Sequence, residues 1–141
     1  MVRPVAAGDI MDGKTILVVD DEPVWLNILS KFFGHYGYAV LTASTSIQAA
    51  ELLRRHRPDC LLLDYVLADG DAGELCVLVR SDAALCGIPI VIFTGDPEAE
   101  TCLEGPYRAD RLFFKGEALP HLLLLVVSLI RGDHRDKPLS G

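Results

Sequence analysis

The chain contains four short, largely apolar runs, and a charged or hydroxyl-bearing residue stands at or directly after the end of each run. Unbroken apolar runs are typical of parallel strands that are buried on both faces. Segments with helical spacing of apolar residues alternate with the runs, so the sequence predicts an α/β fold with a parallel sheet. The runs are Thr15–Val19, Asp59–Leu63, Ile88–Phe93 and Arg111–Phe114.

A fifth strand and several helices are predicted between these runs. Pro23 fits the first turn of a helix that Gly37 ends, and Tyr38–Thr42 follows as a strand. A second helix is predicted from an N-cap among residues 44–46 to Pro58, with Ile47, Ala50, Leu52 and Leu53 on its inner face. Further helices are predicted at Glu74–Arg80, at Pro97–Leu103 in short or irregular form before Gly105-Pro106, and at Ala118–Arg131.

The size and charge of the chain limit the classes of function. Its 141 residues fit one domain, which we place at residues 14–131 between a flexible arm (1–13) and a polar tail (132–141). The net charge of -7, without a basic stripe, argues against direct binding of nucleic acid.

No sequence feature points to secretion or to a membrane. Residues 1–13 lack the apolar core of a signal peptide, and no apolar run approaches the roughly 20 residues that a membrane span needs. The four cysteines form no CxxC pair, which argues against a zinc site and favours small core residues in a reducing compartment. We therefore expect a cytoplasmic protein. The cysteines are Cys60, Cys76, Cys86 and Cys102.

The residues at the ends of the runs form the candidate site. Asp20 and Asp21 follow the first run, Asp64 follows the second, and Thr94 and Lys115 follow the last two. The carboxyl ends of parallel strands lie at one edge of a sheet, where open α/β proteins bind ligands. Three carboxylates, a hydroxyl and an amine would therefore share one pocket, which suits a divalent metal and a phosphoryl group.

Each residue type has a chemical reason to be there. Adjacent carboxylates repel each other, so burying Asp20 with Asp21 needs a compensating cation, and Mg²⁺ prefers such oxygen ligands. Asp64 could be a metal ligand, a nucleophile that forms an aspartyl phosphate, or both. The Thr94 hydroxyl could donate to a phosphoryl oxygen, and the Lys115 ammonium could counter its charge. Taken singly, each residue could equally be a helix cap, a solvated side chain or a strand former.

As a set, these motifs resemble the response-regulator receiver domains of two-component signalling. The resemblance covers residues 14–131 and implies a single-domain, doubly wound five-stranded parallel sheet of the flavodoxin-like (CheY-like) type. The matching stretches are Ile16–Pro23, Leu61–Asp64, Pro89–Gly95 and Phe113–Lys115.

The resemblance also implies separate roles for these residues. Asp64 would accept a phosphoryl group from a histidine kinase or a histidine phosphotransfer protein. Mg²⁺ would be bound by Asp21, Asp64 and the backbone carbonyl of Val66, and by Asp20 partly through water. Thr94 would act as the switch hydroxyl and Lys115 would contact the phosphoryl group. Such a domain is a signalling phosphoacceptor with self-phosphorylation and slow dephosphorylation chemistry, rather than an enzyme, and it acts by protein contact.

Four features depart from the family pattern and keep other functions open: three single positions, and a region before Gly105-Pro106 that is shorter than a regular fourth helix. Leu112 stands where an aromatic residue is usual, Gly116 replaces a proline that follows the lysine in a cis peptide, and Ala68 replaces a common loop proline. For Gly116 we predict a trans bond or a rearranged loop. Leu112 and Gly116 raise the alternative of a phosphorylation-independent adaptor. A Mg²⁺-dependent aspartyl phosphatase is a weaker alternative, because the sole Asp-x-Asp motif, at 69–71, does not follow the first strand.

The last predicted helix, residues 118–131, is apolar on nearly every side. Such a helix is covered on more than one stripe of its surface. Either it packs deeply beside the neighbouring helices, or it presents an apolar patch to a second copy of the chain or to another partner.

Overall fold

The central element of the computed structural model, which describes residues 13–103 and 108–132, is a five-stranded parallel sheet. Its strands are β1 (Thr15–Val19), β2 (Ala39–Ala43), β3 (Cys60–Leu63), β6 (Ile90–Thr94) and β7 (Arg111–Phe114). Their order in the sheet is β2-β1-β3-β6-β7, and all neighbours run parallel. The predicted fold class is confirmed. The fourth apolar strand begins at Ile90 instead of Ile88, after a proline that cannot donate to the ladder.

Local signals explain where the first two helices begin and end. Helix α1 (Pro23–His35) starts at a proline and ends before Gly37, whose φ of 90° suits a residue without a side chain. Helix α2 (Ser46–His56) starts after Thr45, whose hydroxyl accepts the Gln48 N–H at 3.2 Å.

The second half of the chain contains smaller elements that the sequence pattern did not predict in full. After β3, a short hairpin is formed by β4 (Val66–Leu67) and β5 (Gly70–Asp71), and Asp71 then caps α3 (Ala72–Ser81). The predicted irregular helix is a 3-10 helix, η2 (Pro97–Leu103). The last helix is α4 (Leu119–Ile130). Gly105-Pro106, residues 1–12 and residues 133–141 lie outside the described part of the chain.

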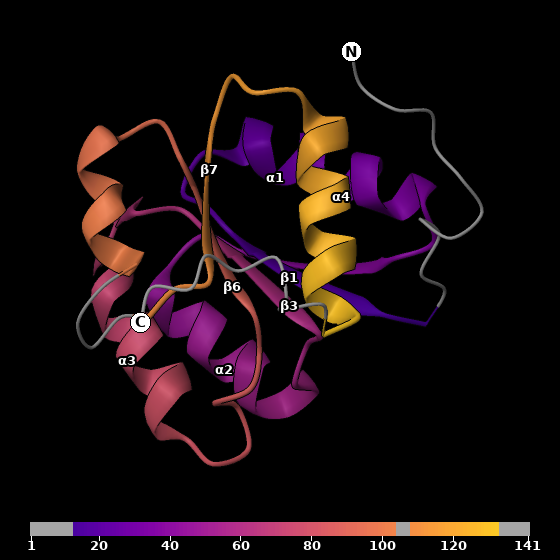
Figure 1. The fold of residues 1–141 in the computed structure, drawn as a ribbon. Helices are drawn as coiled ribbons and strands as arrows, with labels where there is room; N and C mark the ends of the chain where they lie inside the picture. Colours follow the sequence, from indigo (N-terminus) through magenta and orange to yellow (C-terminus); the bar gives the residue numbers. More distant parts are fainter. Residues whose placement is uncertain (1–12, 104–107, 133–141) are drawn as a thin grey trace.

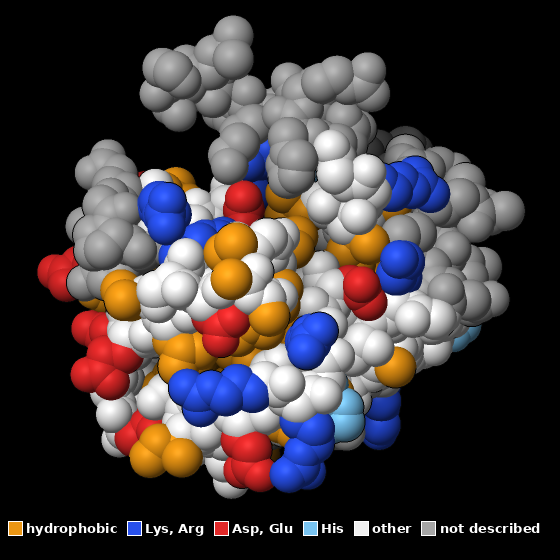
Figure 2. Space-filling model, turned by 90° about the horizontal axis from the view of Figure 1, so that it is seen from below, with side chains coloured by type: hydrophobic (Ala, Val, Ile, Leu, Met, Phe, Trp, Pro, Cys, Tyr) orange, Lys and Arg blue, Asp and Glu red, His pale blue; other side chains and the backbone are white. Residues whose placement is uncertain are grey.

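The helices cover the sheet in two layers. Helices α1 and α4 lie on one face of the sheet, and α2 and α3 lie on the other (Figure 1). Each face of the sheet has its own hydrophobic core, and alternate residues of a strand belong to opposite cores. Leu61 and Leu63 pack toward α2 and α3, while Leu62 packs toward α1 and α4. On the side of the molecule that Figure 2 shows, basic and acidic side chains are interspersed around hydrophobic ones.

Two predictions of core positions are wrong. Ile47 is 75% exposed, because α2 turns Ala49 and Leu53, four residues apart, toward the sheet. Cys86 is also exposed, because it follows α3 in a surface turn, whereas Cys60 and Cys76 are buried as predicted. Burial raises the pKa of the Cys60 thiol, which suits an inert core residue. The side chain of Cys102 lies outside the described part.

Helix α4 packs into the core on several sides. Five of its side chains are buried, and none of its large apolar side chains is among the exposed ones of the described residues. This supports the packing interpretation of its sequence. The buried residues of α4 are Leu122, Leu123, Val126, Val127 and Leu129.

No helix in the described part of the chain has the length and hydropathy needed to cross a membrane.

Candidate functional site

The five candidate residues meet at the carboxyl edge of the sheet, where the strand order reverses between β1 and β3. Backbone hydrogen bonds hold three of them in register with the neighbouring strand. The Asp20 N–H donates to Ala43, the Asp64 N–H to Val19, and the Lys115 N–H to Thr94, at 2.9–3.1 Å. Each functional side chain therefore extends a strand, and the sheet determines the separations between them.

A lysine and two carboxylates form the buried centre of the site. The Lys115 ammonium lies 2.8 Å from Asp20 Oδ2 and 3.1 Å from Asp64 Oδ2. Asp20 is fully buried and Asp64 is 6% exposed. The Asp20 Oδ1 atom accepts the Glu22 N–H at 2.9 Å, whereas Oδ2 has no well-aligned donor although it is in contact with the Lys115 ammonium.

The protonation of this centre reflects competition between burial and charge. Burial raises the pKa of Asp20, and the nearby Asp64 carboxylate adds to the rise against the opposing effect of Lys115. For Lys115, burial alone would lower the pKa, but hydrogen bonds and charge attraction from Asp20 and Asp64 raise it overall. The site thus has more negative charge than one ammonium balances.

We expect Asp20→Asn to stabilise the metal-free protein at about pH 7 by about 1 kcal/mol. The folded pKa of Asp20 lies above its ordinary value of 3.8, so ionisation of Asp20 costs the folded state more than the unfolded state. The wild type should therefore lose stability, relative to the variant, as the pH rises from 3.8 through the folded pKa of Asp20. Urea unfolding in a chelator across this pH range measures the difference.

The exposed neighbour supplies the control for that experiment. Asp21→Asn removes a negative charge from the same edge without touching a buried group, so it reports the general charge effect. A stability difference between wild type and Asp20→Asn that stays constant or shrinks with rising pH would contradict the assignment. Added Mg²⁺ should reduce the advantage of the variant, because a ligand stabilises the form that binds it.

The donor set around this centre fits a hard cation. Carboxylate oxygens of Asp20, Asp21, Glu22 and Asp64 lie within 4.8 Å of one another. Such a cluster of oxygens suits Mg²⁺, and the poorly satisfied Oδ2 of buried Asp20 fits the same interpretation. Val66, whose carbonyl is a predicted ligand, lines the same pocket.

The pocket itself is open and has a volume of about 520 Å³, and most of its lining residues are charged or polar. Thr94 is 2% exposed at its wall, and its hydroxyl oxygen accepts the Asp96 N–H at 3.3 Å. All of the predicted site residues except the deeper Asp20 line this pocket; the lining also includes Glu22, Gly95 and Asp96. The lining residues are Asp21, Glu22, Asp64, Val66, Thr94, Gly95, Asp96 and Lys115.

The peptide bond between Lys115 and Gly116 is trans, which is one of the two outcomes predicted for this turn. No peptide in the described residues is cis, and Gly116 has a φ of 106°. The Glu117 carboxylate accepts the Phe114 N–H at 2.8 Å, and the Glu117 N–H donates to the Phe114 carbonyl at 3.1 Å. Glu117 therefore closes the glycine turn that follows Lys115.

Sequence reasoning missed several neighbours of the site. Glu22 was not among the predicted site residues, yet its carboxylate lies 3.7 Å from the Lys115 ammonium. Its position directly after the acidic pair was the available signal. The ring centroids of Trp25 and Phe93 lie 5.5 and 5.7 Å from the Lys115 ammonium. Nothing in the local sequence predicts these contacts.

The other acidic motif has a structural role. Asp69 accepts N–H groups at the start of α2, and Asp71 accepts the Gly73 N–H at the start of α3. Both carboxylates of the Asp-x-Asp motif are thus engaged at helix ends. This arrangement gives no support to an aspartyl phosphatase centre at that loop.

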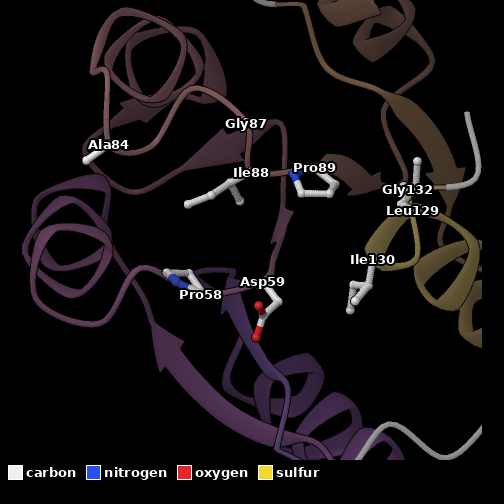
Figure 3. Close-up of a pocket in the computed structure, with 9 residues that line it drawn as sticks. All are labelled: Pro58, Asp59, Ala84, Gly87, Ile88, Pro89, Leu129, Ile130 and Gly132. Atoms are coloured by element: carbon white, nitrogen blue, oxygen red, sulfur yellow. The ribbon is translucent and has the colours of Figure 1, made fainter.

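A second hollow of about 320 Å³ lies near the amino ends of the strands (Figure 3). Its walls include Pro58, Ile88, Pro89 and Ile130. The one carboxylate that lines it, Asp59, accepts the Thr15 N–H at 2.8 Å. It therefore lacks the collection of reactive groups that the larger pocket has.

Comparisons with known proteins agree with this geometry. Residues 16–124 match the model of the response regulator receiver domain. The chain is 33% identical over 95 residues to the phosphate regulon transcriptional regulatory protein PhoB of Pseudomonas aeruginosa, covering 67% of this chain and 42% of that protein. It is 33% identical over 124 residues to the response regulator MprA of Mycobacterium leprae, covering 87% and 52%.

A solved structure shows the same fold. The signal receiver domain of a signal transduction histidine kinase from Syntrophus aciditrophicus superimposes with a TM-score of 0.77 at 25% identity, covering 92% of this chain and 98% of that one. The chain spans about half the length of the curated relatives it matches. The family match, which covers most of the chain, and the shared fold lead to one conclusion: the chain belongs to the receiver domains of two-component response regulators.

Proposed function

We propose that Asp64 accepts a phosphoryl group from a histidine kinase or a histidine phosphotransfer protein, with Mg²⁺ bound beside it. One observation carries this proposal: the Asp64 carboxylate opens into a polar pocket while an ammonium lies 3.1 Å from its Oδ2 atom. Within the described residues, no other acidic cluster could hold a metal ion.

Each residue of the site would have a role that follows from its chemistry. Asp20, Asp21, Asp64 and the Val66 carbonyl would hold Mg²⁺, which when bound neutralises negative charge on phosphoryl oxygens. Lys115 would move its ammonium from the two carboxylates toward the transferred group. The Thr94 hydroxyl, which is a hydrogen-bond acceptor for Asp96 in the resting site, would donate to a phosphoryl oxygen.

The transfer itself needs little covalent chemistry from the protein. An Asp64 oxygen forms a bond to phosphorus while the bond from phosphorus to the donor's imidazole nitrogen breaks, and the electron pair stays on that nitrogen. Water later cleaves the acyl phosphate and restores the carboxylate. The result is a reversible signal carried by the domain, read through contacts with other proteins.

We expect the wild-type protein to gain one phosphoryl group when it is incubated with Mg²⁺ and a small acyl-phosphate donor. Intact-mass measurement should show the gain, and peptide mapping should place it on Asp64. A chelator should suppress it, because the phosphoryl charge would then lack its counter-ion. A protein that gains no mass under these conditions would contradict the proposal.

A second candidate is an adaptor that works without phosphorylation. The observation in its favour is Leu112, which is half-buried and packs against the core on the side of α2 and α3. An aromatic ring is usual at this place in the family, so its coupling to Thr94 is missing here. The phosphorylation assay separates the two candidates.

We further propose how far the domain extends and where it acts. The receiver domain would span residues 14–131, with an arm at 1–13 and a tail at 132–141, in the cytoplasm and without direct contact to nucleic acid or membrane. A homodimer or partner contact through residues 118–131 is also a proposal, although the burial of α4 supports packing within the domain. Light scattering with and without phosphorylation tests it.

A further inference from the structure

The hairpin after Asp64 determines where the Val66 carbonyl lies. Each of its strands is only two residues long, with Val66 opposite Asp71 and Leu67 opposite Gly70. A hairpin of this size has little stability by itself. The Ala72 N–H donates to the Tyr65 carbonyl at 2.8 Å and closes its base, but the turn at Ala68 and Asp69 is exposed.

Asp69 ties this exposed turn to α2. Its Oδ1 atom accepts the Ser46 N–H at 2.9 Å, and its Oδ2 atom accepts the Ser46 hydroxyl at 2.8 Å and the Ile47 N–H at 3.3 Å. These N–H groups belong to the first turn of α2, where they have no partner within the helix and favour a negative charge. The same hydrogen bonds, led by the one from the Ser46 backbone, lower the pKa of Asp69.

The helix does not need Asp69 for its local cap. Thr45 already accepts the Gln48 N–H at the same end of α2, and Gln48 in turn accepts the Ser44 N–H at 3.0 Å. The contact from Asp69 spans 23 residues and joins the helix to the acceptor loop. Ala68 leaves this turn without a residue of restricted φ, so the turn depends on other restraints.

We propose that Asp69 is a positioning residue, which holds the hairpin against α2 so that the Val66 carbonyl stays at the metal pocket. The proposal rests on the proposed function, in that Mg²⁺ is taken to bind beside Asp64. Asp69 does not touch the metal or the phosphoryl group. It acts through the hairpin, as residues behind a metal ligand commonly do.

The test compares Asp69→Ala with Thr45→Ala, a control that removes a hydrogen bond at the same helix end but does not touch the hairpin. Mg²⁺ affinity can be followed through the fluorescence of Trp25, the sole tryptophan, which lies beside Lys115. Loss of a residue behind a metal ligand costs about 10–100-fold in affinity, and we expect about 3- to 10-fold here because the contact is exposed. The phosphorylation rate at saturating Mg²⁺ should stay near that of the wild type.

Hydrogen exchange gives a readout that needs neither metal nor phosphoryl donor. In Asp69→Ala, the amides of residues 67–72 should exchange faster than in the wild type, and in Thr45→Ala they should not. Asp69→Asn, which keeps one acceptor oxygen, should fall between wild type and Asp69→Ala in both measurements.

The outcomes separate this inference from the function on which it rests. Equal Mg²⁺ affinity in wild type and Asp69→Ala, or equal exchange of the hairpin amides, would overturn the positioning role alone. An equal loss of affinity in Thr45→Ala would also overturn it, because the effect would then come from α2 in general. A wild type without a saturable Mg²⁺ response would overturn the proposed metal site and this inference with it.

Discussion

Asp64→Asn is expected to abolish phosphorylation by both a small acyl-phosphate donor and a kinase. The amide has nearly the shape of the carboxylate, but its oxygen is a far weaker nucleophile, so no acyl phosphate forms. Asp64 is 6% exposed, and its Oδ2 atom meets the Lys115 ammonium at 3.1 Å. The other carboxylates at the site differ from Asp64: Asp20 is fully buried, Asp21 forms no ion pair with Lys115 in the described structure, and Glu22 lies farther from the ammonium, at 3.7 Å.

Asp96→Asn is the matched control for that experiment. Asp96 lines the same pocket, but its carboxylate accepts the Glu98 N–H at 2.9 Å and makes no ion pair with Lys115 among the described residues. This variant should still gain one phosphoryl group, though its rate can change. A stoichiometric mass gain in Asp64→Asn would show that another residue is the acceptor and would remove the central assignment.

The sequence predicted the site well because the parallel sheet turns sequence position into spatial position. A side chain at the end of a buried strand must lie at the carboxyl edge of the sheet, whatever the lengths of the intervening segments. Asp20, Asp64, Thr94 and Lys115 were therefore brought together once the apolar runs were recognised as strands. Position in the sheet does not determine the chemical roles of these residues, and the phosphorylation experiments test those roles.

The sequence predicted helix faces less well, because a short helix offers several apolar stripes. Ile47 follows the helical spacing of Ala50 and Leu53, but the structure buries Ala49 and leaves Ile47 exposed. The small size of Ala49 lets α2 approach the sheet closely, which hydrophobicity alone does not reveal. The β4–β5 hairpin was missed for a related reason, since two-residue strands are too short to show a period.

Contacts between segments that are distant in the sequence could not be predicted from local sequence patterns. Arg80 was predicted only as the end of a helix, yet its guanidinium makes five hydrogen bonds. It donates twice to the Arg108 carbonyl and once each to the carbonyls of Cys86 and Ile88 and to the Asp110 carboxylate. These bonds join α3 to the loop before β6 and to the segment that enters β7.

These hydrogen bonds hold the segment before β7, which has little regular secondary structure. The segment before β7 follows a 3-10 helix, and Arg108 has a φ of 48°, a left-handed conformation that costs a non-glycine residue free energy. The Asp110 Oδ2 atom accepts both the Arg80 guanidinium and the Ile90 N–H, each at 2.8 Å. Arg80 therefore anchors the start of the two strands that carry Thr94 and Lys115.

Arg80→Met is expected to destabilise the protein by about 3–5 kcal/mol, the range for breaking a buried ion pair by removing one partner. The side chains of Arg80 and Asp110 are only 10% and 12% exposed, so water cannot readily replace the donors to the Asp110 carboxylate and the Ile88 carbonyl, whereas the bonds to Arg108 and Cys86 are exposed. Methionine keeps the length of the apolar stem and so tests the hydrogen bonds more than the packing. Because small domains have about 5–15 kcal/mol of stability in total, such a loss is large and is measurable by urea unfolding.

Arg55→Met is the control, because the pair of Arg55 with Glu51 has a separation of 3.0 Å, close to the 2.8 Å of Arg80 with Asp110, but is 65% and 66% exposed. That variant should change the free energy of unfolding by about 0.5 kcal/mol or less. Similar values for the two variants would mean that the guanidinium of Arg80 is a surface group in solution and not an anchor. A large loss in Arg80→Met alone, with faster amide exchange in residues 108–114, would show that an arginine on α3 holds the strand that presents Lys115.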